Sequence, residues 1–445
     1  MSDAVIEMDA IAAAQPTFTA KPSWGHDALP AWFAEAREQA WQQFVDTPMP
    51  KRTDEEWRFA SLKQLAFDDY ICPAAVDETV AADLITRTST LEKCSAKIVF
   101  ANDQLIADPL VDAELVAQGV ICKPIAQALR EDGDLIREHF MNRDARLGSA
   151  KFAALNLARL RAGVFVYVPK GVVVEHPIEI YHWLSGENAS VFPHTLIVTG
   201  ENAGVSVIDY FASEKEQAGF ACSVADLVAG RGSQLKHVCS QNWAEKAKSI
   251  HINSTTVGAD ADVKALILNL GTEWSRSESV SHLVGRGANS DMLSVCLPEG
   301  AQEMDQRTLQ LHEQPHTTSD LLYKNALYDQ SRTIFAGLIK VGEDAHFTDA
   351  YQTCRNLLLS DECEANAMPG LEINADQVKC SHGSTSSPIT EEELFYLKAR
   401  GISDKIARQL VTFGFVNQAI CRLQHAELED VIRGKIQRRF DRIGS

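Results

Sequence analysis

The stretch Gly200–Asp209, GENAGVSVID, joins a glycine-rich turn to an alternating run of apolar and polar residues. A glycine-containing turn followed by a similar run returns at Gly230, Gly258 and Gly285. The intervals between these glycines are 30, 28 and 27 residues. A period of this length, built from strands and turns, indicates a repeat architecture in which each unit buries its apolar face against its neighbours.

The region around these turns, residues 96–387, is a series of short β-rich runs, apart from a helical stretch at about 125–160. Runs at 164–168, 195–198 and 264–268 are examples. No helical pattern separates the strands, which disfavours a sheet with crossover helices. Stacked, degenerate repeats favour a mainly β fold with a right-handed parallel β-helix core, and a β-sandwich remains the alternative.

The N-terminal region, residues 1–95, has helical periodicity after a loose start. Residues 31–44, AWFAEAREQAWQQF, carry one apolar stripe at helical spacing. Thr53 and Glu56 fit a capping box that would open a second, short helix. We therefore expect a helical domain that packs on something larger.

The C-terminal region, residues 388–445, is helical again. Thr390 begins a capping-box pattern, and Gly401 is placed to end the helix that follows. Ser403 would begin the next helix, and Gly414 would stop it. Such helices either cap the last exposed rung of the repeat, which the sequence alone slightly favours, or form a docking module.

The composition is that of a globular protein with an acidic surface. Hydrophobic residues make up 45% and charged residues 23% of the chain, and the formal net charge is −19. Such a surface repels phosphate backbones and anionic lipid, so nucleic acids and membranes are disfavoured as partners. The N-terminal residues lack the pattern of a secretory signal, and no apolar run approaches the roughly 20 residues of a membrane span. We expect a cytoplasmic protein with reduced thiols.

The common enzyme motifs and zinc motifs are absent from the sequence. None of the ten cysteines forms a CxxC pair, which disfavours zinc-ribbon and thioredoxin-type sites. The sequence contains neither GxSxG nor HExxH, and it has no P-loop. Hydrolase chemistry of these classes, and ATP binding through a P-loop, are therefore disfavoured.

Cys380 and His382 stand two residues apart at the end of a strand-like run. At strand spacing, residues i and i+2 point to the same face, so a thiol and an imidazole would project side by side. Both are ligands that hold iron in sulfide-containing clusters, but a site needs three or four ligands. The alternative is an exposed histidine beside a buried cysteine in a turn. Cys354 and Cys363, nine apart, fit no four-ligand pattern and are expected to be structural.

Several segments resemble the SufB/SufD family of iron–sulfur cluster assembly scaffold proteins. Residues 369–385, PGLEINADQVKCSHGST, followed by 391–402, EEELFYLKARGI, are similar to the C-terminal signature of that family. The segments FAALN at 152–156 and VYVPKG at 166–171 look like the family's entry into its β-helix. The resemblance spans roughly residues 50–420.

Within the family, two segments resemble the SufD branch. Residues 54–62, DEEWRFASL, are similar to that branch, and Cys380–His382 stands where SufB-type chains carry Glu-His-Glu. Cys354 aligns with the key cysteine of SufB-type chains but lacks the Asp-Ser that follows it there. We expect Cys354 to be an incidental core residue.

The resemblance implies a non-catalytic scaffold subunit with two partners. It implies pairing with a SufB-like subunit through the β-helix, and binding of a SufC-type ABC ATPase through the C-terminal helices at 388–445. A nascent cluster would be built at the SufB–SufD interface, where His382, with Cys380 as helper, would form a transient iron or cluster half-site. No cofactor bound tightly to the isolated chain is expected. Reduced flavin in the complex, and a homodimer in isolation, remain open.

Two other functions remain open at this point. One is a β-helix enzyme that acts on polysaccharide, although such enzymes are commonly exported and the N-terminus lacks an export pattern. The other is a SufB-like chain that serves alone as a homodimeric scaffold.

Overall fold

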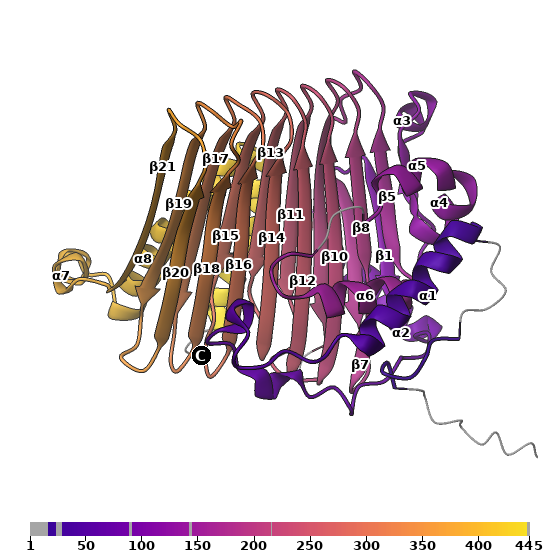
Figure 1. The fold of residues 1–445 in the computed structure, drawn as a ribbon. Coiled ribbons are helices and arrows are strands. Elements are labelled where there is room, and N and C mark those ends of the chain that lie inside the picture. Colours follow the sequence, from indigo (N-terminus) through magenta and orange to yellow (C-terminus); the bar gives the residue numbers. More distant parts are fainter. Residues whose placement is uncertain (1–16, 24–28, 89–90, 142–144, 215, 443–445) are drawn as a thin grey trace, which may run out of the picture.

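The core of the protein is a solenoid of two β-sheets that lie face to face (Figure 1). It is described from a computed structural model, which covers residues 17–23, 29–88, 91–141, 145–214 and 216–442. Successive strands of the solenoid alternate between the sheets, and almost every pairing is parallel. This confirms the predicted parallel β-helix core, and the sandwich alternative is wrong.

We name each sheet by its last strand. The β21 sheet contains β1 (Ala96–Ala101), β2 (Gln104–Leu105), β3 (Leu110–Val111), β6 (Ile178–Leu184), β9 (Gly204–Ser213), β11 (Gln234–Asn242), β13 (Asp262–Asn269), β15 (Asn289–Cys296), β17 (Thr318–Leu327), β19 (Asp349–Leu358) and β21 (Lys379–Pro388). The β20 sheet contains β4 (Ile121–Pro124), β5 (Gly163–Val168), β7 (Ala189–Val191), β8 (His194–Thr199), β10 (Gly219–Ala229), β12 (Ala247–Val257), β14 (Trp274–Leu283), β16 (Glu303–His312), β18 (Arg332–Val341) and β20 (Glu364–Ile373). Only the short pairings β1–β2, β1–β3 and β4–β5 are antiparallel among the named strands.

The repeating glycines occupy the corners where the chain leaves the β20 sheet. A Cβ atom at Gly230 would lie 2.5 Å from the carbonyl oxygen of Thr199, and one at Gly258 would lie 2.8 Å from that of Ala229. Each of these glycine N–H groups donates a hydrogen bond to the same carbonyl oxygen, at 2.8 and 2.9 Å. The corners of successive coils therefore stack backbone on backbone, which leaves no room for a side chain.

Helices cover the start of the solenoid (Figure 1). They are α1 (Ala31–Asp46), η1 (Glu55–Trp57), η2 (Leu62–Leu65), α2 (Glu78–Thr86), α3 (Ala113–Ala117), α4 (Ile125–Glu131), α5 (Gly133–His139) and α6 (Ala150–Arg159). The predicted helix at 31–44 is confirmed as α1, and the stretch at 125–160 contains α4, α5 and α6. An aromatic cluster that includes Trp41, Phe152 and Phe220 joins α1 and α6 to strand β10.

The capping box predicted at Thr53 and Glu56 is wrong. The segment forms only the single turn η1, which is preceded by Asp54 and has no side-chain cap. Its path is determined instead by Trp57, which is buried and stacks on Trp274 of β14 at a centroid distance of 6.5 Å. Packing on the sheet thus decides the conformation here, because burial of an indole outweighs a local helix signal.

The C-terminal helices are α7 (Glu391–Lys398), α8 (Asp404–Ile420), η3 (Cys421–Leu423) and α9 (Ala426–Arg442). The capping box at Thr390 is confirmed. Gly401 ends the first helix in a left-handed conformation, with φ of +83°, and its N–H donates to the carbonyl of Lys398. Ser403 caps α8 as predicted.

Gly414 does not stop α8, which continues six residues further to Ile420. Val416, Ala419 and Ile420 are buried in the largest apolar cluster of the protein. A mid-helix glycine costs about 1 kcal/mol relative to alanine, which is less than the contribution of three buried apolar side chains.

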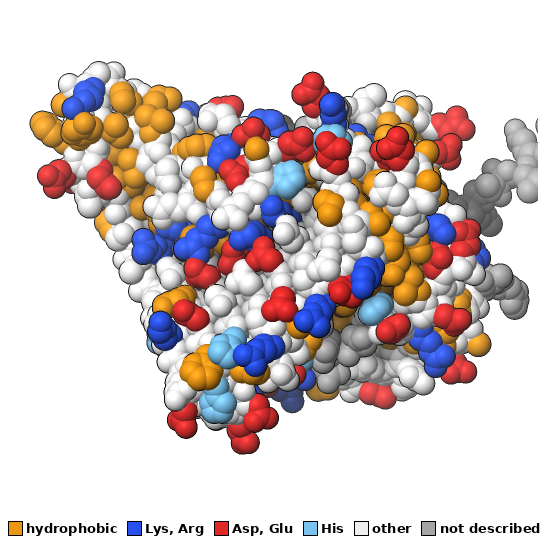
Figure 2. All heavy atoms as spheres, turned by 90° about the horizontal axis from the view of Figure 1, so that it is seen from above, with side chains coloured by type: hydrophobic (Ala, Val, Ile, Leu, Met, Phe, Trp, Pro, Cys, Tyr) orange, Lys and Arg blue, Asp and Glu red, His pale blue; other side chains and the backbone are white. Residues whose placement is uncertain are grey.

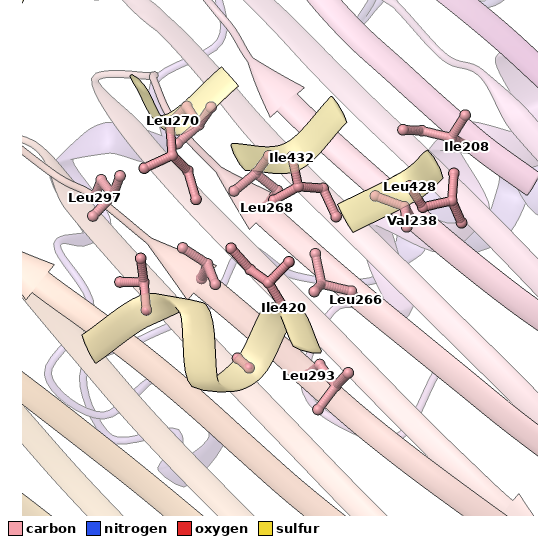
Figure 3. Close-up of a cluster of buried hydrophobic side chains, with 14 of the residues drawn as sticks. Ile208, Val238, Leu266, Leu268, Leu270, Leu293, Leu297, Ile420, Leu428 and Ile432 are labelled. Atoms are coloured by element: carbon pink, nitrogen blue, oxygen red, sulfur yellow. The ribbon is translucent and has the colours of Figure 1, made fainter. Parts of the chain in front are cut away.

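The helices α8 and α9 lie along the outer face of the β21 sheet. Figure 3 shows Ile420, Leu428 and Ile432 packed against Leu266 and Leu268 of β13 and against neighbouring strands. Strand β21, the last strand of the sheet, is exposed along almost its whole length. The interpretation of these helices as a cap over the last rung is therefore wrong. None of the helices in the described ranges is both long and apolar enough to cross a membrane.

Candidate iron half-site at the open end of the solenoid

The solenoid ends without a covering element. Strand β21 pairs with β19, strand β20 pairs with β18, and neither has a second neighbour among the strands of the described ranges. Leu371 and Ile373 of β20 continue the inward-facing rows of Ile339 and Val341, yet they are 37% and 40% exposed. The end therefore combines unpaired strand edges with partly exposed residues of the interior.

The register of β21 places Cys380 and His382 on its inward face. Cys380 pairs with Ala350 and His382 pairs with Gln352, and both of these β19 residues are buried inside the solenoid. Side chains that pair in register on adjacent parallel strands share a face, so the thiol and the imidazole point into the lumen. Both side chains belong to the last rung, so another molecule can reach them from the uncovered end of the solenoid.

The two side chains differ in their surroundings. Cys380 is half-buried and packs against an apolar cluster that includes Ile339 and Val341. Burial first, and then the carboxylate of Asp349, raise the pKa of this thiol. His382 is exposed. The imidazole is therefore the more accessible of the two side chains, and the thiol is the more sheltered one.

Cys354 lies one strand further inside the lumen. It pairs with Ser384, is fully buried, and packs with Tyr323 and Phe335. Adjacent strands lie about 4.8 Å apart and rise about 3.3 Å per residue, so its Cα lies about 8 Å from that of His382. Burial raises the pKa of the Cys354 thiol to about 12. The thiol is thus neutral at physiological pH, whereas a metal ligand must be a thiolate.

Two further side chains of these kinds, those of Cys363 and His312, form hydrogen bonds elsewhere in the protein. Cys363 donates to the carbonyl of Ser360 at 3.0 Å, in the turn between β19 and β20. His312 is buried and bonded to Thr317 and Ser319. In the part of the chain that the structure describes, no group of three or more His, Cys, Asp or Glu residues could hold a metal ion. Cys380 and His382 are therefore a pair of candidate ligands, and the described residues offer no third ligand beside them.

Sequence reasoning missed an apolar surface on the C-terminal helices. Phe395 and Tyr396 of α7 are 73% and 58% exposed, and Ile406 and Leu410 of α8 are 47% and 50% exposed. Figure 2 shows apolar side chains gathered over the projection that carries α7 in Figure 1. We call these four residues the α7–α8 patch. The structure shows that α7 buries only Leu394, which the sequence pattern does not indicate.

A cavity of about 390 Å³ adjoins this patch. It lies between α7 and α8, and its lining residues are Thr390, Glu392, Glu393, Tyr396, Leu397 and Val411. An exposed aromatic pair beside an apolar hollow is typical of a protein-binding surface.

Comparison with known proteins relates most of the chain, residues 18–180 and 182–415, to one family. Residues 182–415 match the family model described as "SUF system FeS cluster assembly, SufBD core domain", and residues 18–180 match "SufBD protein N-terminal region". A protein of Staphylococcus epidermidis named "Iron-sulfur cluster assembly SufBD family protein" is 27% identical over 401 residues. That alignment covers 87% of this chain and 85% of the relative.

Further relatives carry related names. A protein of Bacillus subtilis named "Iron-sulfur cluster assembly protein SufB" is also 27% identical over 401 residues, with 87% and 85% of the two chains covered. A SufBD family protein of Staphylococcus saprophyticus is 26% identical over the same length and coverage. The matched ranges include the solenoid, its open end, and the first two C-terminal helices up to residue 415. The chain belongs to the SufBD family of the SUF iron–sulfur cluster assembly system.

Proposed function

We propose that this chain is a SufD-type, non-catalytic scaffold subunit of the SUF complex. The observation that carries the proposal is the pair Cys380 and His382, which face the lumen from a terminal strand. Two ligands on an unpaired edge are half of an iron or cluster site, and a second chain docked at that edge would supply the rest. Iron and the nascent cluster are then the cargo of the complex.

The proposed partner at the open end is a SufB-like subunit. Strands β20 and β21 offer unpaired backbone groups over ten residues each, and an exposed edge of this kind pairs readily with a strand of another chain. The exposed inward residues Leu371 and Ile373 would be covered by the same contact. Covering the lumen would also place His382 opposite residues of the partner.

The proposed partner at the C-terminal helices is a SufC-type ATPase. The α7–α8 patch supports this assignment, because an apolar surface on a projecting helix is favourable only when it is covered. Helix α8 is anchored on the β21 sheet through its buried face. Movement of the ATPase would therefore be transmitted to the solenoid through α8.

A reconstituted complex tests the role of His382. We would co-express the chain with SufB-like and SufC-type subunits, purify the complex, and supply iron and sulfide without oxygen. His382→Ala should abolish the cluster absorbance and leave complex assembly intact. Ser381→Ala is the matched control, because Ser381 is the neighbour on the outward face of the same strand. Normal cluster formation by the His382 variant would exclude the proposed role.

A second candidate function is a SufB-like scaffold that acts as a homodimer. The similarity to the relative named SufB supports this candidate, as does the position of Cys354 beside the last rung. Mass measurement of the purified chain, alone and mixed with a SufB-like subunit, separates the two functions. A homodimer that persists in the mixture would favour the second. The polysaccharide-enzyme alternative is not proposed, because membership of the SufBD family gives it no support.

A further inference from the structure

Residues 52–63, which we call the strap, follow α1 and cross the outer face of the β20 sheet (Figure 1). Two buried arginines of that sheet hold the strap by its backbone. Arg276 of β14, which is 0% exposed, donates to the carbonyl oxygen of Glu56 at 2.9 Å. Arg307 of β16, which is 3% exposed, donates to the carbonyl oxygen of Arg58 at 2.7 Å. The strap is therefore fixed to the sheet as far as Arg58.

A second attachment follows three residues later. The backbone N–H and the hydroxyl of Ser61 both donate to the carboxylate of Glu303 on β16, at 2.8 and 2.6 Å. Phe59 lies between the two attachments and has a φ of +69°, which is an outlier for a bulky side chain. Its side chain is 41% exposed, so burial of the ring does not compensate for this conformation. The attachments thus hold an aromatic ring toward solvent, and backbone strain of this kind is typical of ligand clamps.

A cleft of about 610 Å³ lies beside this ring. Its lining includes three cationic and two apolar side chains, namely Arg52, Lys63, Arg332, Phe59 and Leu62. None of its lining residues is acidic. Arg332 pairs with the carboxylates of Glu303 and Glu364, at 3.1 and 3.4 Å. Arg52 and Lys63 are exposed, and neither has a carboxylate within ion-pair distance among the described residues.

A further cation lies against the exposed ring itself. The guanidinium of Arg58 lies over the Phe59 ring, 5.2 Å from its centroid, so a ligand that contacts the ring also comes close to this charge. Arg58 is exposed and forms no ion pair within the described part of the chain. In a chain of net charge −19, three cations without carboxylate partners around one aromatic ring create a local positive potential.

We propose that the strap and its cleft bind an acidic peptide segment of a partner protein. Carboxylates of the segment pair with Arg52, Arg58 and Lys63. An apolar side chain of the segment packs against Phe59 and Leu62. Charge complementarity supports this occupant, and aromatic residues and arginine are the side chains enriched in the centres of protein interfaces.

Other anions fit the strap less well. A small inorganic anion would leave the Phe59 ring exposed. A long polyanion such as a nucleic acid would be repelled by the rest of a chain of net charge −19. The proposal is independent of the scaffold role, because it uses neither the residues of the open end nor the α7–α8 patch.

A random dodecapeptide library, selected on the immobilised full-length chain, supplies the probe. Selection should enrich peptides that carry two or more Asp or Glu residues beside an aromatic or aliphatic residue. Exchanging these acids for Asn and Gln should weaken binding at least about tenfold in fluorescence anisotropy. Enrichment without acidic residues, equal binding by the amide peptide, or displacement of the peptide by a single-stranded oligonucleotide would each overturn the proposal.

Phe59→Gly separates peptide binding from folding. Glycine adopts a positive φ without strain, so this variant should unfold at the same temperature as the natural chain or higher, while peptide affinity falls at least about tenfold. Phe347→Gly is the matched control, because Phe347 also has a positive φ, +60°, and is 50% exposed, but lies between β18 and β19. The control should bind the peptide normally. Unchanged peptide affinity of Phe59→Gly would refute the assignment.

The cations are tested in the same way. Arg52→Gln combined with Lys63→Gln should weaken peptide binding about tenfold. Lys93→Gln, at an exposed lysine before β1, should leave it unchanged. Thermal unfolding of each variant shows that the fold is retained. Full affinity in the double variant would place the peptide elsewhere on the chain and exclude the strap as its site.

Discussion

His382 lies beside Gln352 in the parallel register of β21 and β19, and on its other side no strand of the described ranges follows. Gln352 is buried within the lumen, whereas His382 is exposed. The same row of inward positions therefore passes from interior to surface within a single strand spacing. A second chain docked at this edge could therefore replace the solvent around the imidazole without any rearrangement of the solenoid.

Replacing the thiol beside it should weaken cluster formation without abolishing it. Cys380→Ser keeps the size of the side chain but removes the sulfur ligand, while His382 remains. We expect several-fold less cluster absorbance in the anaerobically reconstituted complex, with the melting temperature within about 2 °C of the natural chain. A cluster yield equal to that of the natural chain would mean that Cys380 only packs against Ile339 and Val341.

Truncating the α7–α8 patch should weaken binding of the ATPase. Phe395→Ala and Tyr396→Ala remove the two most exposed aromatic side chains of the patch. Aromatic residues at the centre of an interface contribute about 2 kcal/mol or more each, so affinity should fall at least about 30-fold. Binding kinetics on immobilised chain measure this directly. Leu110→Ala, an exposed residue at the other end of the solenoid, is the control and should bind normally.

The fold could be predicted because its repeat depends on a local steric requirement. The corner glycines must lack a side chain, so the coil period is visible in the sequence itself. The positions of the helices could not be predicted in the same way. The amphipathic spacing of apolar residues predicted α1, and the capping residue Ser403 predicted the start of α8. Neither pattern indicates which surface of the solenoid the helix packs against. The end of α8 beyond Gly414 depends on that surface.

The candidate site was predictable only in its local part. The spacing of Cys380 and His382 in a strand implies one shared face, whatever surrounds the strand. The position of Cys354 relative to His382 depends on the register between β19 and β21, which pairs residues 30 positions apart in the sequence, such as Gln352 and His382. Phe395 and Tyr396 were missed because exposed and buried aromatic residues look alike in a helical pattern.

Adding a side chain at a corner should destabilise the solenoid. The Cβ atom in Gly230→Ala would lie 2.5 Å from the carbonyl oxygen of Thr199, so the stacked backbones must separate. We expect a loss of about 1–3 kcal/mol in the free energy of unfolding, measured by urea denaturation. Gly414→Ala is the matched control, because no atom lies within 4 Å of its Cβ position in α8. It should stabilise the protein by up to about 1 kcal/mol.

The buried thiol of Cys354 should make stability depend on alkaline pH. Burial raises its pKa from 9.0 to about 12 in the folded chain, so between these values the unfolded chain has lost a proton that the folded chain retains. The folded chain binds more protons in this window, and stability therefore falls as pH rises from 9 toward 12. Between pH 8 and pH 10 the thiol should lower the free energy of unfolding by about 1.4 kcal/mol. Urea denaturation of the natural chain and of Cys354→Ala at both pH values measures the difference. If both chains lose the same stability, the thiol titrates normally in the folded state and does not belong to the closed interior.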